Sequence, residues 1–179
     1  MNNRWDERYR NNDMSDKPPE LVVVEHVSTL PPGAALDVAC GLGRHTVWLA
    51  EHGWRVIAVD YSTVALDALR PRVSGHVEVV QADLEAGEFI IAQASYDLIC
   101  DCCFLHRPLF EPMKAGLKPG GLFIGVFPRR GSFRLEPGEL DPYFESWDIL
   151  HRFDGYPGGD PARHWRDEIV ARKPLSARE

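Results

Sequence analysis

The stretch from Ala34 to Ser62 constrains the fold more than any other part of the chain. A short apolar run leads into a turn that contains Gly41 and Gly43, and a segment with apolar residues at helical spacing follows. A second apolar run then ends on Asp60. The pattern predicts strand, glycine turn, helix and strand, which is the beginning of an α/β fold.

The glycine turn indicates a ligand. Two glycines one residue apart allow the backbone to turn sharply and to approach a bound molecule, which then lies across the amino end of the next helix. Asp60 follows Gly43 by 17 residues and is placed to accept hydrogen bonds from a ribose diol. We therefore expect a pocket for a cofactor that contains a nucleoside.

The spacing around the turn bears on which nucleoside it binds. The dinucleotide fingerprint G-x-G-x-x-G requires a third glycine, and Thr46 occupies that position. Asp37 lies four residues before Gly41, and a carboxylate there suits a cofactor with an ammonium group, such as S-adenosylmethionine (SAM). A glycine turn without a ligand, in an ordinary α/β protein, is the alternative.

Composition indicates which classes of substrate and binding partner to expect. The 179 residues carry a net charge of −7 and contain no run rich in Lys or Arg, so we expect a small-molecule substrate and no nucleic acid. No apolar stretch approaches 18 residues and no secretory signal is present, which predicts no membrane contact and a cytoplasmic protein. Three of the four cysteines, Cys100, Cys102 and Cys103, are crowded without the spacing of a zinc site, so we expect neither a metal nor a disulfide framework.

Periodicity and turn residues predict the remaining elements. Leu105–Gly116 is expected to be helical, and the L-K-P-G-G sequence after it is expected to be a turn. The further helices are expected at about 19–30, 44–51, 63–69 and 137–145, although Val22-Val23-Val24 in the first of them also suits a strand. The strands are expected at 34–38, 55–59, 77–81, 96–100, 122–127, 147–153 and 165–172.

Several motifs together resemble the class I SAM-dependent methyltransferases. The acidic residue before G-x-G, the acidic residue after the second strand, Asp83 after the third strand and L-K-P-G-G before the fifth strand occur in the order of that family. The segments WDERY, LDVACGLGRHTVWLAEHGWRVIAVDYS, FLHRPLFEPMKAGLKPGGLFI and RDEIVARKP are similar to the small tellurite-resistance and thiopurine-type methyltransferases. The likeness covers most of the chain from Ala34 to Pro174.

The resemblance implies an α/β, Rossmann-like three-layer sandwich with helices on both faces of a seven-stranded sheet. The implied strand order is 3-2-1-4-5-7-6, with strand seven antiparallel, and SAM lies at the carboxyl ends of the strands. The implied cofactor-binding residues are Asp37, Ala39, Gly41, Gly43, Arg44, Asp60, Tyr61, Asp83, Leu84 and Asp101. Among these, Asp60 is expected to bind the ribose and Asp83 the adenine edge.

The N-terminal segment, residues 1–19, is polar except for Trp5 and Tyr9, which share one face of a possible helical turn. We expect a lid that adds Trp5 and Tyr9 to the cofactor-binding residues, or else a clip or tail. Residues 20–179 are expected to form a single methyltransferase domain.

The candidate catalytic residues follow the fourth strand. His106 is the best candidate for a general base, although it could instead hydrogen-bond its own loop. Arg107 could bind an oxyanion or pair with a surface carboxylate.

The positions of the arginines suggest a small acceptor that is anionic or strongly polarisable. The resemblance to the tellurite-resistance and thiopurine-type methyltransferases implies a soft nucleophile, of the tellurite, selenite or thiol type. The arginines follow strands four and five and flank the last hairpin: Arg107, Arg129, Arg130, Arg134, Arg163 and Arg166. Pairing with Glu139, Asp141, Asp160 and Asp167 is the alternative. The competing functions are a module that binds SAM or adenosine without catalysis and an NAD-type oxidoreductase, and the protein is expected to be a monomer or a homodimer.

Overall fold

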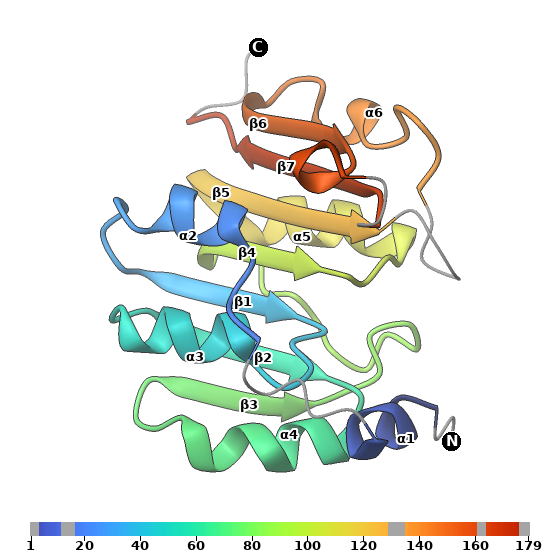
Figure 1. Ribbon diagram of the computed structural model, residues 1–179. Helices are drawn as coiled ribbons and strands as arrows, with labels where there is room; N and C mark the ends of the chain where they lie inside the picture. Colours follow the sequence, from blue (N-terminus) through green and yellow to red (C-terminus); the bar gives the residue numbers. More distant parts are fainter. Residues whose placement is uncertain (1–3, 12–16, 129–134, 161–163, 176–179) are drawn as a thin grey trace. The chain divides into compact units, whose positions relative to one another are not determined.

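A computed structural model describes residues 4–11, 17–128, 135–160 and 164–175 (Figure 1). The chain divides into two compact units, residues 1–90 and 91–179. The strands form a seven-stranded sheet in the order β3-β2-β1-β4-β5-β7-β6, which confirms the expected order.

The element bounds agree with most of the predictions. The strands are β1 (Ala34–Val38), β2 (Arg55–Asp60), β3 (Val77–Gln81), β4 (Tyr96–Cys102), β5 (Leu117–Pro128), β6 (Asp148–Gly155) and β7 (Arg166–Arg172). The α-helices are α1 (Arg4–Asn11), α2 (Leu21–Val27), α3 (Arg44–Glu51), α4 (Thr63–Leu69), α5 (Phe110–Gly116) and α6 (Asp141–Phe144). Short 3-10 helices cover Arg70–Arg72, Arg107–Leu109 and Pro157–Gly159.

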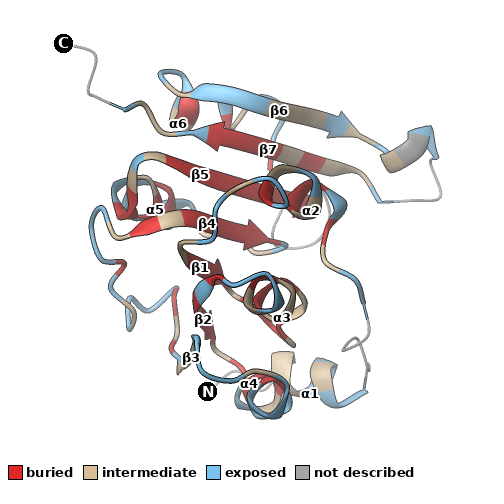
Figure 2. Ribbon diagram, turned by 90° about the vertical axis from the view of Figure 1, so that its left-hand side faces the viewer, coloured by how far each residue is buried: buried red, intermediate tan, exposed pale blue. Residues whose placement is uncertain are grey.

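In the first unit, β1, β2 and β3 are parallel, with Asp37 opposite Ala58 and Asp60 opposite Gln81. Helix α3 lies against one face of β1 and β2 (Figures 1 and 2). Parallel strands are usually buried on both faces, and four of the five β1 residues are buried accordingly. This register brings the carboxyl ends of three strands to the same edge of the sheet.

In the second unit, β4 and β5 are parallel, whereas β7 is antiparallel to both β5 and β6. The antiparallel direction expected for β7 is confirmed. An aromatic cluster fills the core: the Phe110 ring meets the Phe127 ring edge-on at a centroid distance of 5.9 Å, and Phe123 stacks on Phe144 at 4.9 Å. Lys173 Nζ donates to the carbonyl oxygens of Lys114 and Leu117 at 2.7 Å each, which satisfies groups at the end of α5.

Three predicted boundaries were wrong: a proline decided the first, strand pairing the second, and Gly138, whose φ is +74°, the third. Helix α5 begins at Phe110 and not at Leu105, since the residues before it form a 3-10 turn that contains Pro108. The L-K-P-G-G segment lies inside β5 and not in a turn before it; a register shift opposite Tyr96 absorbs the extra residues, and Gly120 takes a φ of +80°. Helix α6 covers a single turn, Asp141–Phe144, instead of 137–145.

Within the described ranges, no helix is long and apolar enough to cross a membrane.

A polar contact in the first unit ties the segment before α2 to the first turn of α3. The Glu20 backbone N–H donates to His45 Nε2 at 3.2 Å, and the Glu20 carboxylate pairs with Arg44 at 2.6 Å. His45 is buried, and this burial lowers its pKa to about 3. Because the ring must accept the Glu20 N–H bond, the folded protein requires neutral His45.

This contact predicts an acid-sensitive contribution to stability. Between pH 6.5, the ordinary pKa of His, and about pH 3, the unfolded chain binds a proton that the folded chain excludes, so stability falls as pH falls. Replacing His45→Gln keeps an acceptor for the Glu20 N–H. We expect wild type to lose about 2 kcal/mol more than this variant between pH 7 and pH 5, measured by urea unfolding.

The matched control is His76→Gln, because His76 is exposed. Burial raises the pKa of Asp37 to about 6, so the Asp37 carboxyl increases stability as pH falls, opposite to His45. This contribution is the same in wild type and in His45→Gln, so it cancels in the comparison. Parallel stability–pH curves for wild type and His45→Gln would contradict the prediction.

Candidate functional site

The glycine turn between β1 and α3 forms a tight loop. Ala39, Gly41 and Gly43 have φ values of +50°, +55° and +76°. The Cys40 N–H donates to the Val59 carbonyl at 2.9 Å, which fixes the start of the loop against the end of β2. Positive φ at Ala39, a residue with a side chain, is uncommon and marks a strained backbone of the kind found at binding sites.

Asp60 connects the loop to the end of β2. One carboxylate oxygen accepts the Gly41 N–H at 2.7 Å, and the other accepts the Ser62 N–H at 2.8 Å. Burial raises the pKa of Asp60, and hydrogen bonds from the backbone of Ser62 and Gly41 act against that rise. A carboxylate has about four acceptor positions, so Asp60 keeps the capacity to accept hydroxyl groups from a ribose.

Asp37 lies in β1 below the loop. Its carboxylate is buried and accepts the Thr46 hydroxyl at 2.5 Å, so it joins β1 to α3. Burial is the main cause of its raised pKa, and Thr46 and Arg44 act in the opposite direction. Thr46, which occupies the position of the missing third glycine, therefore serves as the partner of Asp37.

The loop after β3 comes close to Asp60 through the backbone. The Ala82 N–H donates to the Asp60 carbonyl at 3.0 Å, so Asp83 and Leu84 follow directly beyond the site. Asp83 Oδ1 accepts the N–H groups of Glu85 and Ala86 at 2.9 and 3.1 Å, which shapes its own turn. Leu84 is buried, and Tyr61 is half-buried beside Asp60.

Two predicted cofactor residues have structural contacts of their own. The Arg44 guanidinium reaches Glu20 at 2.6 Å and the Pro18 carbonyl at 3.4 Å, so its side chain holds the segment before α2. A Cβ on Gly43 would lie 2.3 Å from Leu69 Cδ1 of α4. Gly43 is therefore required by helix packing and by its positive φ.

Helix α1 lies on the loop. The Tyr9 hydroxyl occupies the space next to Gly41, where an added Cβ would lie 2.7 Å from it. Asp6 Oδ1 accepts the Ser62 hydroxyl at 2.5 Å, and Ser62 also caps α4 by accepting the Ala65 N–H at 3.2 Å. The structure thus brings Tyr9 together with Gly41, and Trp5 lies beside Tyr9 with a ring-centroid distance of 6.1 Å.

The remaining predicted site residues belong to the second unit. Asp101 is buried in β4 opposite Gly125 of β5, and His106 is half-buried near the Phe104 ring at a centroid distance of 6.5 Å. The exposed Arg107 guanidinium donates from Nε and from a terminal nitrogen to the two carboxylate oxygens of Glu139. The pairing expected as the alternative for Arg107 is therefore present.

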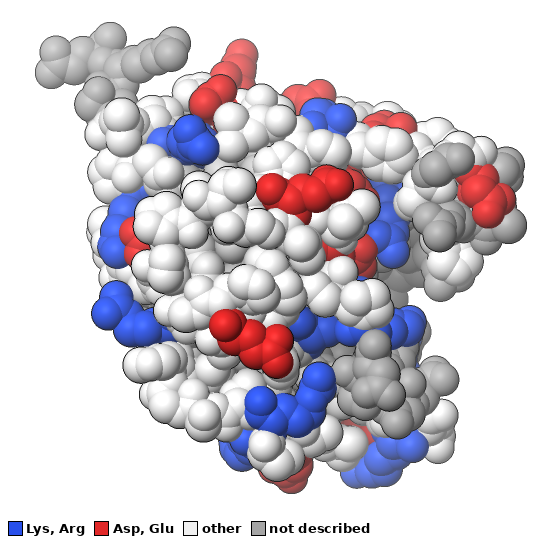
Figure 3. All heavy atoms as spheres, turned by 60° about the vertical axis from the view of Figure 1, so that its left-hand side comes forward, with Lys and Arg blue, Asp and Glu red and all other residues white. Residues whose placement is uncertain are grey.

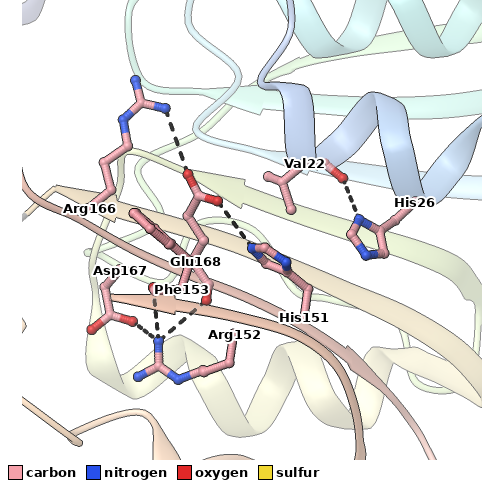
Figure 4. Close-up of polar contacts among 8 residues, drawn as sticks. All are labelled: Val22, His26, His151, Arg152, Phe153, Arg166, Asp167 and Glu168. Atoms are coloured by element: carbon pink, nitrogen blue, oxygen red, sulfur yellow. Dashed lines mark hydrogen bonds and ion pairs between the residues drawn. The ribbon is translucent and has the colours of Figure 1, made fainter. Parts of the chain in front are cut away.

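The β6–β7 hairpin carries a second set of ion pairs (Figure 4). Arg152 pairs with the buried Asp167 and lies 3.5 Å from Asp141. Arg166 lies 4.0 Å from Glu168, which also contacts His151 at 3.3 Å. Arg129, Arg130, Arg134 and Arg163, which were expected to border the acceptor, lie outside the described residues.

The sequence did not reveal the contact between Asp6 and Ser62. Ser62 was recognisable as a helix N-cap, but Asp6 is 56 residues away and belongs to a polar segment. The signal was the WDERY segment, whose Trp5 and Tyr9 indicated docking without indicating where.

Comparison with known proteins finds similarity to methyltransferases. A methyltransferase domain model matches residues 35–121. The chain is 25% identical over 147 residues to the probable SAM-dependent methyltransferase TehB of Haemophilus influenzae, covering 72% of this chain and 50% of that protein. It spans about half the length of the curated relatives it matches.

Two solved structures share the fold. The structure of H. influenzae TehB matches with a TM-score of 0.73 and 21% identity, over 96% of this chain and 66% of that one. A Burkholderia thailandensis 1,6-didemethyltoxoflavin-N1-methyltransferase, solved with its substrate and S-adenosylhomocysteine, matches with a TM-score of 0.70 and 19% identity, over 96% and 84% of the two chains. SAM is the cofactor of this class of enzyme. By the domain match over residues 35–121 and the likeness to TehB, the chain resembles the class I SAM-dependent methyltransferases of the TehB type.

Proposed function

We propose that this protein transfers a methyl group from SAM to a small acceptor. The observation that carries the proposal is the Asp60 carboxylate, which lies at the carboxyl end of β2 and is anchored to the glycine loop at Gly41. In this assignment Asp60 holds the ribose, the turn from Ala39 to Gly43 faces the amino acid portion, and Asp83 with Leu84 flanks the adenine. The acidic residues suit a cofactor with positive charge.

The chemistry requires little from the protein beyond position. SAM supplies a methyl group on a positively charged sulfur: the acceptor's lone pair forms a bond to the methyl carbon, and the carbon–sulfur electrons remain on sulfur. Holding two reactants in line can contribute roughly 7–11 kcal/mol. A base such as His106 is needed only when the acceptor arrives protonated.

The first test of this proposal concerns Asp60. Asp60→Asn should weaken SAM binding by about 1.5–3 kcal/mol, the range for hydrogen bonds to a charged group. Calorimetric titration measures this loss, and thermal unfolding without ligand reports the separate loss of the Gly41 and Ser62 contacts. Asp67→Asn is the control, because Asp67 is an exposed carboxylate on α4. Equal affinities of wild type and Asp60→Asn for SAM would refute the assignment.

Thermal-shift screening separates the competing functions. A ligand at 100 times its dissociation constant adds about 2.7 kcal/mol of stability. SAM and S-adenosylhomocysteine should stabilise the protein and NAD should not. A module that only binds SAM would give the same shifts without turnover of any acceptor.

We further propose that the segment 1–19 is a lid over the cofactor. The support is that Tyr9 contacts Gly41 and that α1 is bound to the start of α4 through Asp6 and Ser62. Two aromatic side chains on a polar segment then have a defined place to bury their apolar surface.

The lid can be tested from the side of the loop. In Gly41→Ala, the new Cβ would collide with the Tyr9 hydroxyl and displace α1. We expect hydrogen exchange of residues 4–11 to slow when wild type binds S-adenosylhomocysteine and to be faster in the ligand-free variant than in ligand-free wild type. Gly75→Ala is the control for a positive φ, because nothing lies near its added Cβ. Hydrogen exchange of residues 4–11 that depends on neither the ligand nor the variant would contradict the lid and favour the alternative that the segment is a tail.

The acceptor proposed here is small and either anionic or a soft nucleophile, such as tellurite, selenite or a thiol. The similarity to TehB supports this class. On the face drawn in Figure 3, the described Lys and Arg side chains are interspersed with Asp and Glu, whereas a nucleic-acid surface would gather positive charge. Arg107 already presents a planar, two-point contact to a carboxylate, and an oxyanion acceptor would compete with Glu139 for it.

Turnover assays decide the acceptor class. We expect SAM-dependent methylation of tellurite, selenite or a small thiol, with a loss of about tenfold or more in kcat/KM for an anionic acceptor in Arg107→Ala. Glu139→Gln should not show this loss, since it removes the negative charge that would compete with an anionic acceptor for Arg107. Turnover restricted to neutral amines, with no effect of Arg107→Ala, would contradict the acceptor class and leave methyl transfer intact.

A further inference from the structure

Helix α1 brings a carboxylate to the cofactor loop as well as two aromatic rings. The Asp6 side chain is 16% exposed and is bound to the Ser62 hydroxyl. The N–H of Ser62 donates to Asp60, the residue proposed to bind the ribose. Ser62 therefore links the Asp6 carboxylate to the Asp60 carboxylate through two hydrogen bonds. The effect reaches Asp60, since the charge of Asp6 is among the causes that raise the pKa of Asp60.

A carboxylate at this place adds to an acidic site. Asp37 and Asp60 are buried next to the same loop, so a third negative charge from α1 is unfavourable unless a positive ligand compensates it. The positive groups nearby compensate it only partly. Arg10 lies 3.8 Å from Asp6 but is 54% exposed, Arg44 is bound to Glu20, and Arg72 donates to the Leu42 carbonyl at 2.8 Å.

SAM and its product differ in charge, which is the property that interacts with the Asp6 carboxylate. SAM has a positively charged sulfur, and S-adenosylhomocysteine has a neutral thioether in its place. Their ribose and adenine groups are identical, so a negative charge beside the site favours SAM by electrostatics alone. A contact with the ribose or with the closed lid would favour both molecules equally.

We propose that Asp6 is a specificity residue that favours SAM over S-adenosylhomocysteine, supplied to the site by the closing of α1. The inference rests on the proposed function. It assigns the lid a part in product release: after methyl transfer the positive charge has left the cofactor, and the electrostatic part of the attraction that favoured the closed α1 is lost, while the contacts of the aromatic rings remain.

Asp6→Asn tests this directly, because asparagine keeps an oxygen that accepts the Ser62 hydroxyl and removes only the charge. Calorimetry gives the affinities of wild type and variant for SAM and for S-adenosylhomocysteine. We expect the preference for SAM over S-adenosylhomocysteine to fall by roughly three- to tenfold in the variant, the size of one partly screened charge. The loss should come from weaker SAM binding, and raising the salt concentration should diminish the difference between wild type and variant.

Glu7→Gln is the matched control: it removes the same charge from the next residue of α1, which is exposed. An unchanged ratio of affinities in Asp6→Asn would overturn the inference, whether both ligands weaken equally or neither changes. An equal fall of the ratio in Glu7→Gln would also overturn it, since the effect would then belong to the overall charge of the helix. If wild type binds neither SAM nor S-adenosylhomocysteine, the proposed function itself fails.

Discussion

The first unit depends on one buried carboxylate that is held by backbone N–H groups. Asp60 ends β2 and binds the N–H of Gly41 and the N–H of Ser62, so a single side chain joins the glycine loop, the second strand and the start of α4. Burial alone would favour protonation, and the two hydrogen bonds oppose that tendency. The Asp60 side chain thus lies where a ribose is expected, and the loop it binds is held in its strained conformation.

Further contacts hold the glycine loop beside Asp60 from two sides. Below the loop, Asp37 and Thr46 join β1 to α3, and Gly43 leaves the space that Leu69 fills. Above the loop, Tyr9 and Asp6 attach α1. A buried polar group costs stability unless it is hydrogen-bonded, and the hydrogen bonds of Asp37 and Asp60 meet that requirement.

Ion pairs join separate segments of the second unit. Arg152 with Asp167 ties the outer two strands, while the exposed pair of Arg107 and Glu139 joins the segment after β4 to the segment before α6. An anionic ligand at Arg107 would have to replace both hydrogen bonds that Glu139 accepts.

The sequence alone was sufficient for the strands of the first unit, the glycine loop and the place of Asp60 after β2, because strand periodicity and glycine spacing are local properties of the chain. The order of the strands was implied only by the resemblance to a known family, and strand pairing confirms it. It also indicated that Trp5 and Tyr9 must dock somewhere, since a polar segment seldom carries two large aromatic residues without burying them. Only the tertiary structure decided the docking place of α1, the pairing of Arg44 with Glu20 and the bulge that places L-K-P-G-G inside β5. Those features join residues that lie up to 56 positions apart or depend on strand pairing, and no local pattern encodes which distant side chain will fill the space beside a loop.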